Sequence, residues 1–104
     1  MDQADNKLAM LKYYSNYETA TKKAKMYLGK KAELFPSTRA DKKYMILDPT
    51  TNKYVHFGQM GFSDHTKHRD DSVRYRYLRR AINIKGNWRD NKYSPNNLSI
   101  HILW

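Results

Sequence analysis

Apolar residues recur at intervals of three and four through the first quarter of the chain. Leu8, Leu11 and Tyr14 begin a repeat that continues through residues 4–28, and this is the period of an α-helix with one buried face. No proline interrupts the repeat, and Gly29 follows it, where helices often end on a left-handed residue. We therefore predict one long amphipathic helix over residues 4–28 that packs against its own domain.

Two short runs with β-type composition follow a polar segment. Residues 32–41, AELFPSTRAD, contain Pro36 and several turn-forming residues, which predicts a connector. Residues 44–47 and 53–57 are rich in aromatic and β-branched side chains, and the DPTTN stretch between them is rich in turn formers. The pattern predicts a β-hairpin.

A bend with two glycines separates the hairpin from a second helix. Gly58 and Gly61 lie close together after the second run, and we expect both to adopt positive φ angles. Asp70 is a suitable N-cap for a helix over residues 71–84, and Gly86 is placed to close it.

This second helix is predicted to have an apolar side and a basic side. At 100° per residue, Val73, Tyr77 and Ala81 fall on one side, and Arg74 lies among them. The opposite side carries a ridge of polar and basic residues, namely Arg76, Arg79, Arg80 and Asn83.

The last eleven residues carry a strong helix signal. Ser94 is a favourable N-cap, and Pro95 follows at the first helical position. Leu98 and Ile102 then fall four residues apart, as on one face of a helix, but the apolar residues of this stretch also alternate at period two. The cap favours a helix, and a final β-strand is the alternative.

These elements predict an α+β fold in a single small domain. It would comprise a long N-terminal helix, a β-hairpin, an arginine-rich helix and a short C-terminal helix. The chain of 104 residues has the length of one domain. Within it, residues 1–31 would form the amphipathic helix and residues 32–104 the small α+β core.

The composition excludes several classes of protein. The chain has no cysteine, so disulfides and thiolate zinc sites are ruled out. It has no apolar run near the roughly 20 residues that span a bilayer, and it lacks a phosphate-binding loop, a nucleophile elbow and a dinucleotide fingerprint. We therefore expect a soluble intracellular protein that is not an enzyme, with no cofactor, no small-molecule substrate and no membrane span.

The charge changes this picture. The net charge is +10, and residues 63–104 contribute half of it, with nine basic and four acidic side chains. Arginine is one of eleven basic residues before Ser63 but six of nine from there on. Because arginine binds phosphate and carboxylate groups in a forked geometry, the asymmetry indicates a binding surface in the second half of the chain.

Histidines and aspartates cluster between the hairpin and the second helix. Asp64, His65, His68, Asp70 and Asp71 lie within eight residues, and such side chains can hold Mg²⁺, Mn²⁺ or Zn²⁺ in nucleases. Their spacing is not specific, however, and negative charge is also favoured at the start of a helix. We therefore predict no catalytic and no metal-binding residue, and interpret the loop as structural. Its structural residues would be Gly58, Gly61, Ser63, Asp64, His68 and Asp70.

The basic residues around the second helix are the predicted binding site. Phosphate groups or acidic side chains would be held by Lys67, Arg69, Arg76, Arg79 and Arg80. No motif that reads bases accompanies these residues. Binding to nucleic acid would therefore be tolerant of sequence, and acidic protein surfaces are the other class of partner.

The stretches KKYMILDP, KYVHFGQMGFSDHTKHRD and RYRYLRRA resemble a family of small basic proteins of large nucleocytoplasmic DNA viruses, with relatives in some phages. The resemblance covers residues 38–104, and such proteins often end in a segment like YSPNNLSIHILW. This chain has AINIKGNW where relatives often carry more lysine and arginine. The resemblance implies a viral origin. It is carried by His56, Phe57, Gly58, Gly61, Ser63, Asp64, Thr66, His68, Asp70, Arg76, Tyr77 and Trp104.

From the charge and the resemblance together we expect a non-enzymatic structural protein of a virus particle, a minor virion component. Its partners would be other virion proteins or nucleic acid. It would be located in the virion, and in the host cytoplasm or nucleus during assembly. The alternative is a sequence-tolerant DNA- or RNA-binding protein that packages the genome. A metal-dependent nuclease that uses the His/Asp loop is a third and less favoured possibility.

Overall fold

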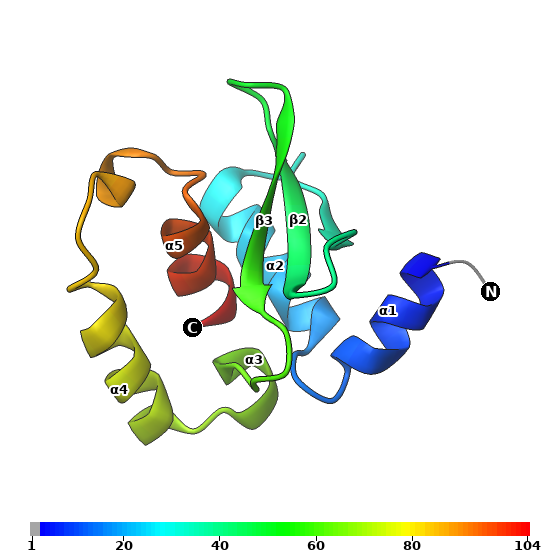
Figure 1. Cartoon of the computed structure of the whole chain (residues 1–104), viewed down its shortest axis with the longest axis horizontal. Helices are drawn as coiled ribbons and strands as arrows, with labels where there is room; N and C mark the ends of the chain where they lie inside the picture. The colour runs from blue at the N-terminus through cyan, green and yellow to red at the C-terminus, as the bar shows by residue number, and fades with distance from the viewer. Residues whose placement is uncertain (1–2) are drawn as a thin grey trace.

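A three-stranded antiparallel sheet lies between the helices of the protein (Figure 1). The computed structural model describes residues 3–104, with side chains from residue 6 onward. The strands are β1 (Leu34–Pro36), β2 (Lys42–Asp48) and β3 (Lys53–Gln59), in the order β1-β2-β3. Tyr44 lies opposite Phe57 in the register of β2 and β3. The predicted hairpin and the α+β class are confirmed.

The prediction that residues 32–41 are only a connector was wrong, because β1 forms within them. Leu34 is buried in the core, and Phe35 lies opposite Met45 of β2. Pro36 ends this strand at the edge of the sheet, where a missing N–H donor removes no bond to a further strand. The short strand is therefore compatible with the proline that argued against it.

The single long N-terminal helix is also wrong. The chain forms α1 (Gln3–Leu11) and α2 (Tyr17–Leu28), separated by a bend. The side chain of Asn16 caps α2 by accepting from the N–H of Thr19 at 3.0 Å, and the carbonyl of Tyr14 accepts from the N–H of Asp64 at 3.0 Å. Because these bonds hold the bend against another part of the chain, the helical repeat is real but does not run through one helix.

The second half of the chain is helical in short pieces. The predicted polar loop contains one helical turn, and the arginine-rich helix ends at Ala81, three residues earlier than predicted. Beyond Ala81 side chains also bond to backbone carbonyls: the amide of Asn83 donates to the carbonyl of Arg79 in α4, and the Trp88 indole donates to the carbonyl of Ile84 after the helix. The helices of this half are α3 (His65–His68), α4 (Asp71–Ala81), the 3₁₀ turn η1 (Trp88–Asp90), α5 (Pro95–Leu98) and the π-helical turn η2 (Ser99–Leu103).

The C-terminal segment is helical, so the alternative of a final strand is wrong. The hydroxyl of Ser94 caps α5 by accepting from the N–H of Asn97, with Pro95 at the first position, as predicted. In a regular α-helix, residues four apart share a face, so adjacent residues point in different directions. The wider π-helical turn η2 instead buries two adjacent residues, Ile102 and Leu103.

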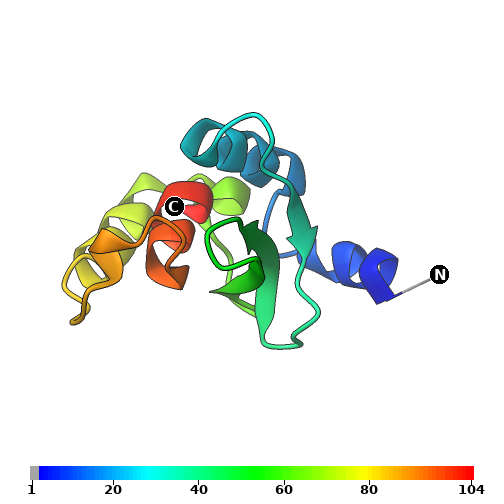
Figure 2. The same cartoon turned by 90° about the horizontal axis from the view of Figure 1, so that it is seen from above.

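The core lies between the sheet, α2 and the C-terminal helices. Tyr44 and Phe57 of the sheet pack with Ala24 of α2 and with Leu98 and Ile102. Views from the front and from above both place α4 at the periphery, away from the sheet (Figures 1 and 2). Helix α4 therefore contributes little to the core and is free to present its outer face.

Candidate functional site

A buried ion pair lies at the start of the predicted loop. The ammonium group of Lys43, on β2, is 2.9 Å from a carboxylate oxygen of Asp64, and both side chains are almost fully buried. Burial lowers the pKa of Lys43, and the charge of Asp64 opposes that shift. Asp64 also caps α3 by accepting from the N–H of Thr66 at 3.0 Å. Its oxygens are thus occupied within the fold.

Thr66 connects this ion pair to the bend between α1 and α2. Its hydroxyl donates to Asp64 and accepts from the backbone N–H of Asn16 at 2.9 Å. The hydroxyl of Ser15 lies 3.1 Å away. The polar groups of Ser15, Lys43, Asp64 and Thr66, which we call the inner network, join β2, α3 and the α1–α2 bend. This supports the predicted structural role of Asp64.

The two histidines of the loop point to different partners. His68 accepts from the N–H of Asp70 at 2.9 Å through its Nδ1, and its ring lies 5.3 Å from that of Trp104. The Nε2 of His65 is 2.9 Å from the carboxylate of Asp71. Within residues 3–104 no group of three or more histidine, aspartate or glutamate side chains converges on a point where a metal ion could be held. The geometry gives no support to a nuclease site.

Two glycines and Asp70 shape the segment as expected. Gly58 and Gly61 have φ angles of +81° and +96°, which confirms that both adopt positive φ. The carboxylate of Asp70 caps α4 by accepting from the N–H and the hydroxyl of Ser72, at 2.9 and 2.8 Å. These hydrogen bonds lower the pKa of Asp70. Ser63 is exposed and borders a cavity described below.

The arginines of α4 form an exposed basic surface. Arg76, Arg79 and Arg80, with Asn83, line a shallow groove on its outer side. In the part of the chain that the structure describes, none of the three arginines forms a salt bridge. We call these three residues the arginine ridge. Its positive charges are not neutralised by the protein, which is the arrangement expected of a surface that binds an anion.

The other two predicted binding residues belong to α3 and its C-cap and not to α4. Lys67 borders a small hollow beside the α1–α2 bend, together with Lys12 and Glu18. Arg69 ends α3 with a φ of +54°, a left-handed conformation that is uncommon for a residue with a side chain. The structure therefore brings together three of the five predicted binding residues and leaves Lys67 in a different hollow.

Sequence reasoning missed the residues that join α4 to the C-terminal segment. The Nε of Arg74 donates to the carbonyl of Trp104 at 2.6 Å. The rings of Tyr77 and Trp104 are stacked, with centroids 4.1 Å apart and an angle of 11° between their planes. The signal was present, because Arg74 is the one arginine on the apolar side of the predicted helix.

A cavity of about 340 Å³ lies between α4, the end of β3 and the C-terminal segment. Its walls include three aromatic rings, those of Phe62, Tyr77 and Trp104. Arg80 lines both this cavity and the groove of the arginine ridge. We call this space the ring cavity. It combines apolar walls with a cation at its border.

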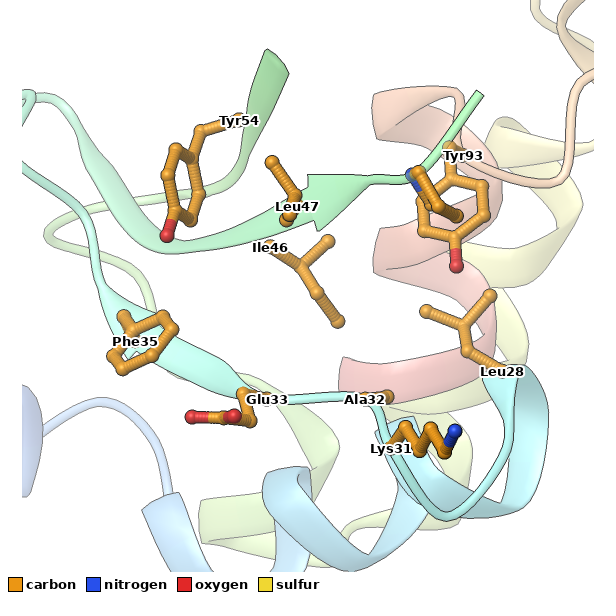
Figure 3. A pocket seen from close by; sticks show the side chains of 10 residues that line it. Leu28, Lys31, Ala32, Glu33, Phe35, Ile46, Leu47, Tyr54 and Tyr93 are labelled. Carbon is orange, nitrogen blue, oxygen red and sulfur yellow. The ribbon is translucent and has the colours of Figure 1, made fainter. Parts of the chain in front are cut away.

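A second aromatic hollow, of about 400 Å³, lies on the opposite end of the sheet (Figure 3). The side chains of Phe35, Tyr54 and Tyr93 surround it, and those of Lys31 and Glu33 border it. We call it the Tyr54 hollow. No arginine lines it, and its one lysine is accompanied by a glutamate.

Comparison with known proteins finds a family that matches part of the chain, but the family has no assigned function. Residues 32–81 match a family described as a family of unknown function (DUF5754). The match begins just before β1 and ends with α4, so it includes Lys43, Asp64 and the arginine ridge. No curated protein and no solved structure matches the chain. Among residues 3–104, no helix has the length and apolar character that crossing a membrane requires.

Proposed function

We propose that the protein is a non-enzymatic binding protein that holds a polyanion, nucleic acid in the first place, on the arginine ridge. The proposal rests on one observation: Arg76, Arg79 and Arg80 gather on the outer side of α4 without an acidic partner. Because the chain resembles small basic viral proteins, we further propose that it acts in a virus particle, as a minor component.

The electrostatics of α4 support an anionic ligand. Three guanidinium groups on one helical face repel one another, and an anion that contacts them relieves this repulsion. The acidic residues nearest in sequence are already engaged, since Asp70 caps the helix and Asp71 lies beside His65. The charge of the ridge is therefore available to a ligand.

Nucleic acid fits this surface because its phosphates repeat along a line. Arginine side chains on successive turns of a helix can follow such a backbone without reading bases. No base-reading element accompanies the ridge, so binding should be tolerant of sequence. The net charge of +10 would add a favourable long-range attraction.

The test is the salt dependence of DNA binding. Fluorescence anisotropy with a labelled duplex, between about 50 and 200 mM salt, should show affinity falling steeply as salt rises. Replacement of all three ridge residues (Arg76→Ala, Arg79→Ala and Arg80→Ala) should reduce the slope of log affinity against log salt by about 0.9 for each lost phosphate contact.

A charge-matched triple variant provides the control. Lys22, Lys30 and Lys53 are exposed, lie outside α4 and do not line the groove of the arginine ridge, so their replacement by alanine removes the same charge from other parts of the chain. The control should retain most of the slope. Equal losses in the two variants, or an unchanged slope in the ridge variant, would contradict the proposal. Each exposed substitution should change the free energy of unfolding by no more than about 0.5 kcal/mol.

An acidic protein surface in the same particle is the second candidate partner. Tyr75 of α4 and Ile82, the residue that follows α4, are 62% and 48% exposed, and arginine with exposed tyrosine is common in protein interfaces. If this partner is the correct one, the protein should stay with the protein shell after nuclease treatment of the particle. Its release together with the genome would exclude this second candidate.

A further inference from the structure

We propose that the ring cavity accepts an unpaired nucleobase while Arg80 and the arginine ridge hold the attached phosphate. The ligand would thus be a nucleotide, either free or within a single strand. This inference rests on the proposed function and adds a substrate class to it, because bases in an intact duplex are stacked and cannot enter a cavity.

One of the three rings that line the cavity is available for stacking on a ligand. Tyr77 and Trp104 already form a parallel stack. Phe62 is 68% exposed at the border of the cavity, so its ring is not needed to complete the core. Stacking of a base on an aromatic side chain contributes about 1–3 kcal/mol and is insensitive to the identity of the base.

Position is the second argument. Because Arg80 lines both the ring cavity and the groove of Arg76 and Arg79, a planar group in the cavity would lie next to a row of cations. A nucleotide has this combination of a planar apolar part and an anionic part. A purely aliphatic ligand would use the cavity but not the neighbouring charges, and an acidic peptide without an aromatic residue would use the charges but has no planar group to stack on the rings.

The volume and the polar groups of the cavity are also suitable. A cavity of about 340 Å³ is within the range of roughly 300–1,000 Å³ for small-molecule sites. Gln59 and Ser63 line it in addition to the rings, and their side chains can hydrogen-bond to the edge of an unstacked base.

Packing of the C-terminal turn on the sheet and on α4 fixes one wall of the cavity. A Cβ atom at Gly58 would lie 2.8 Å from the Cδ1 of Leu103, so glycine allows the C-terminal turn to approach the sheet. Arg74 then holds the carbonyl of Trp104. The indole ring is thereby fixed against Tyr77 at the wall of the cavity.

The Tyr54 hollow provides an internal comparison. It has aromatic rings and a similar volume, but it is lined by one lysine and one glutamate and by no arginine. The same reasoning therefore predicts no nucleotide binding there. Tyr54 is 47% exposed, which makes Tyr54→Ala a suitable matched control.

The experiment compares three labelled probes under one salt condition: a single-stranded oligothymidine, a duplex of equal length and thymidine monophosphate. The wild-type protein should prefer the single strand to the duplex. Phe62→Ala should weaken single-strand binding by about 5-fold to 140-fold, which is the stacking contribution expressed as affinity. Phe62→Tyr should retain binding because it keeps the ring, and duplex affinity should not change.

The outcomes separate the inference from the proposed function. Equal affinity for single strand and duplex, with no effect of Phe62→Ala, would overturn the inference and leave the polyanion proposal standing. Loss of single-strand binding in Tyr54→Ala to the same extent would also overturn it. Failure of the wild-type protein to bind any of the three probes would overturn both.

The mononucleotide distinguishes the two sources of the ligand. Binding of thymidine monophosphate that is lost in Phe62→Ala supports the cavity as a site for free nucleotides. Binding of the oligonucleotide alone, again dependent on Phe62, supports a site that needs a strand. Mononucleotide binding that persists in Phe62→Ala would place the nucleotide elsewhere and contradict the inference.

Discussion

The inner network and the arginine ridge both contain charged side chains but use them in opposite ways. Lys43 and Asp64 are buried and neutralise each other at 2.9 Å. Arg76 and its neighbours are exposed and have no counter-ion among residues 3–104. Fewer than fifteen residues separate Asp64 from the ridge along the chain.

The difference shows how to distinguish structural from functional charge in this protein. A buried charge must be paired, because leaving one partner alone in the interior is strongly unfavourable. An exposed charge carries no such requirement and is available to a ligand. The inner network should therefore determine stability, and the ridge should determine binding.

The largest expected effect comes from breaking the buried pair. Asp64→Asn keeps a side chain that can cap α3 but leaves the charge of Lys43 buried without a partner, and should lower the free energy of unfolding by about 3–5 kcal/mol. Urea denaturation measures this change. Adding Lys43→Met should recover much of the loss, since both charges are then gone.

Asp71→Asn is the control for this substitution. The side chain of Asp71 is 91% exposed, and its removal should change stability by no more than about 0.5 kcal/mol. If Asp64→Asn were as mild as Asp71→Asn, the buried pair would not be the stabilising element that the comparison requires.

The next effect concerns the packing that connects the two regions. Gly58→Ala should destabilise the protein by about 1–3 kcal/mol for the backbone strain at φ +81°, with a further loss from the contact with Leu103 at 2.8 Å. Thermal unfolding measures it. Gly61→Ala is strained in the same way, but nothing lies within 4 Å of the added atom.

The difference between the two glycine variants isolates the contribution of the Leu103 contact. Gly58→Ala should be the more destabilising of the two. Equal destabilisation would show that the C-terminal turn gives way easily and that Gly58 does not determine its position.

The smallest expected effect on stability comes from Asp70, which caps α4 between the inner network and the arginine ridge. Hydrogen bonds from Ser72 and Val73 lower the pKa of Asp70 in the folded protein, so its ionised form favours folding. The stabilisation is complete above the unfolded pKa, near 3.8, and is lost as the pH falls through the lower folded pKa. Asp70→Ala should therefore lower the melting temperature less than Gly58→Ala does. This decrease should be seen at pH values above the unfolded pKa and should disappear as the pH falls through the folded pKa.

Melting curves of the wild type and of Asp70→Ala between pH 2 and pH 7 test this linkage. The two curves should converge at the acid end of the range. A difference that is independent of pH would mean that the carboxylate charge has no part in capping α4.

Much of the fold follows from local patterns in the sequence. Ser94 and Pro95 predicted the start of α5, Asp70 predicted the start of α4, and two β-type runs around a turn-forming stretch predicted the hairpin, because caps and turns depend on neighbouring residues. The predictions failed where distant residues decide. Asn16 begins a new helix at a bend that bonds to Thr66 and Asp64, fifty residues away.

The candidate site likewise has one part that local sequence determines and one part that packing determines. The arginine ridge follows from helical spacing alone, since residues three and four apart share a face. The ring cavity does not, because Phe62, Tyr77 and Trp104 come from three segments. Which of these residues meet is determined by packing.

The polar segment from Gly58 to Arg80 shows both contributions. By itself the sequence determined its positive-φ glycines, the cap at Asp70 and the row of arginines, because each depends on a few adjacent residues. Only the tertiary structure decided that Asp64 is buried against Lys43, and that Arg74 and Tyr77 hold Trp104 beside Arg80. Such pairings depend on which distant segments the core brings together, and the local periodicity of the sequence does not predict them.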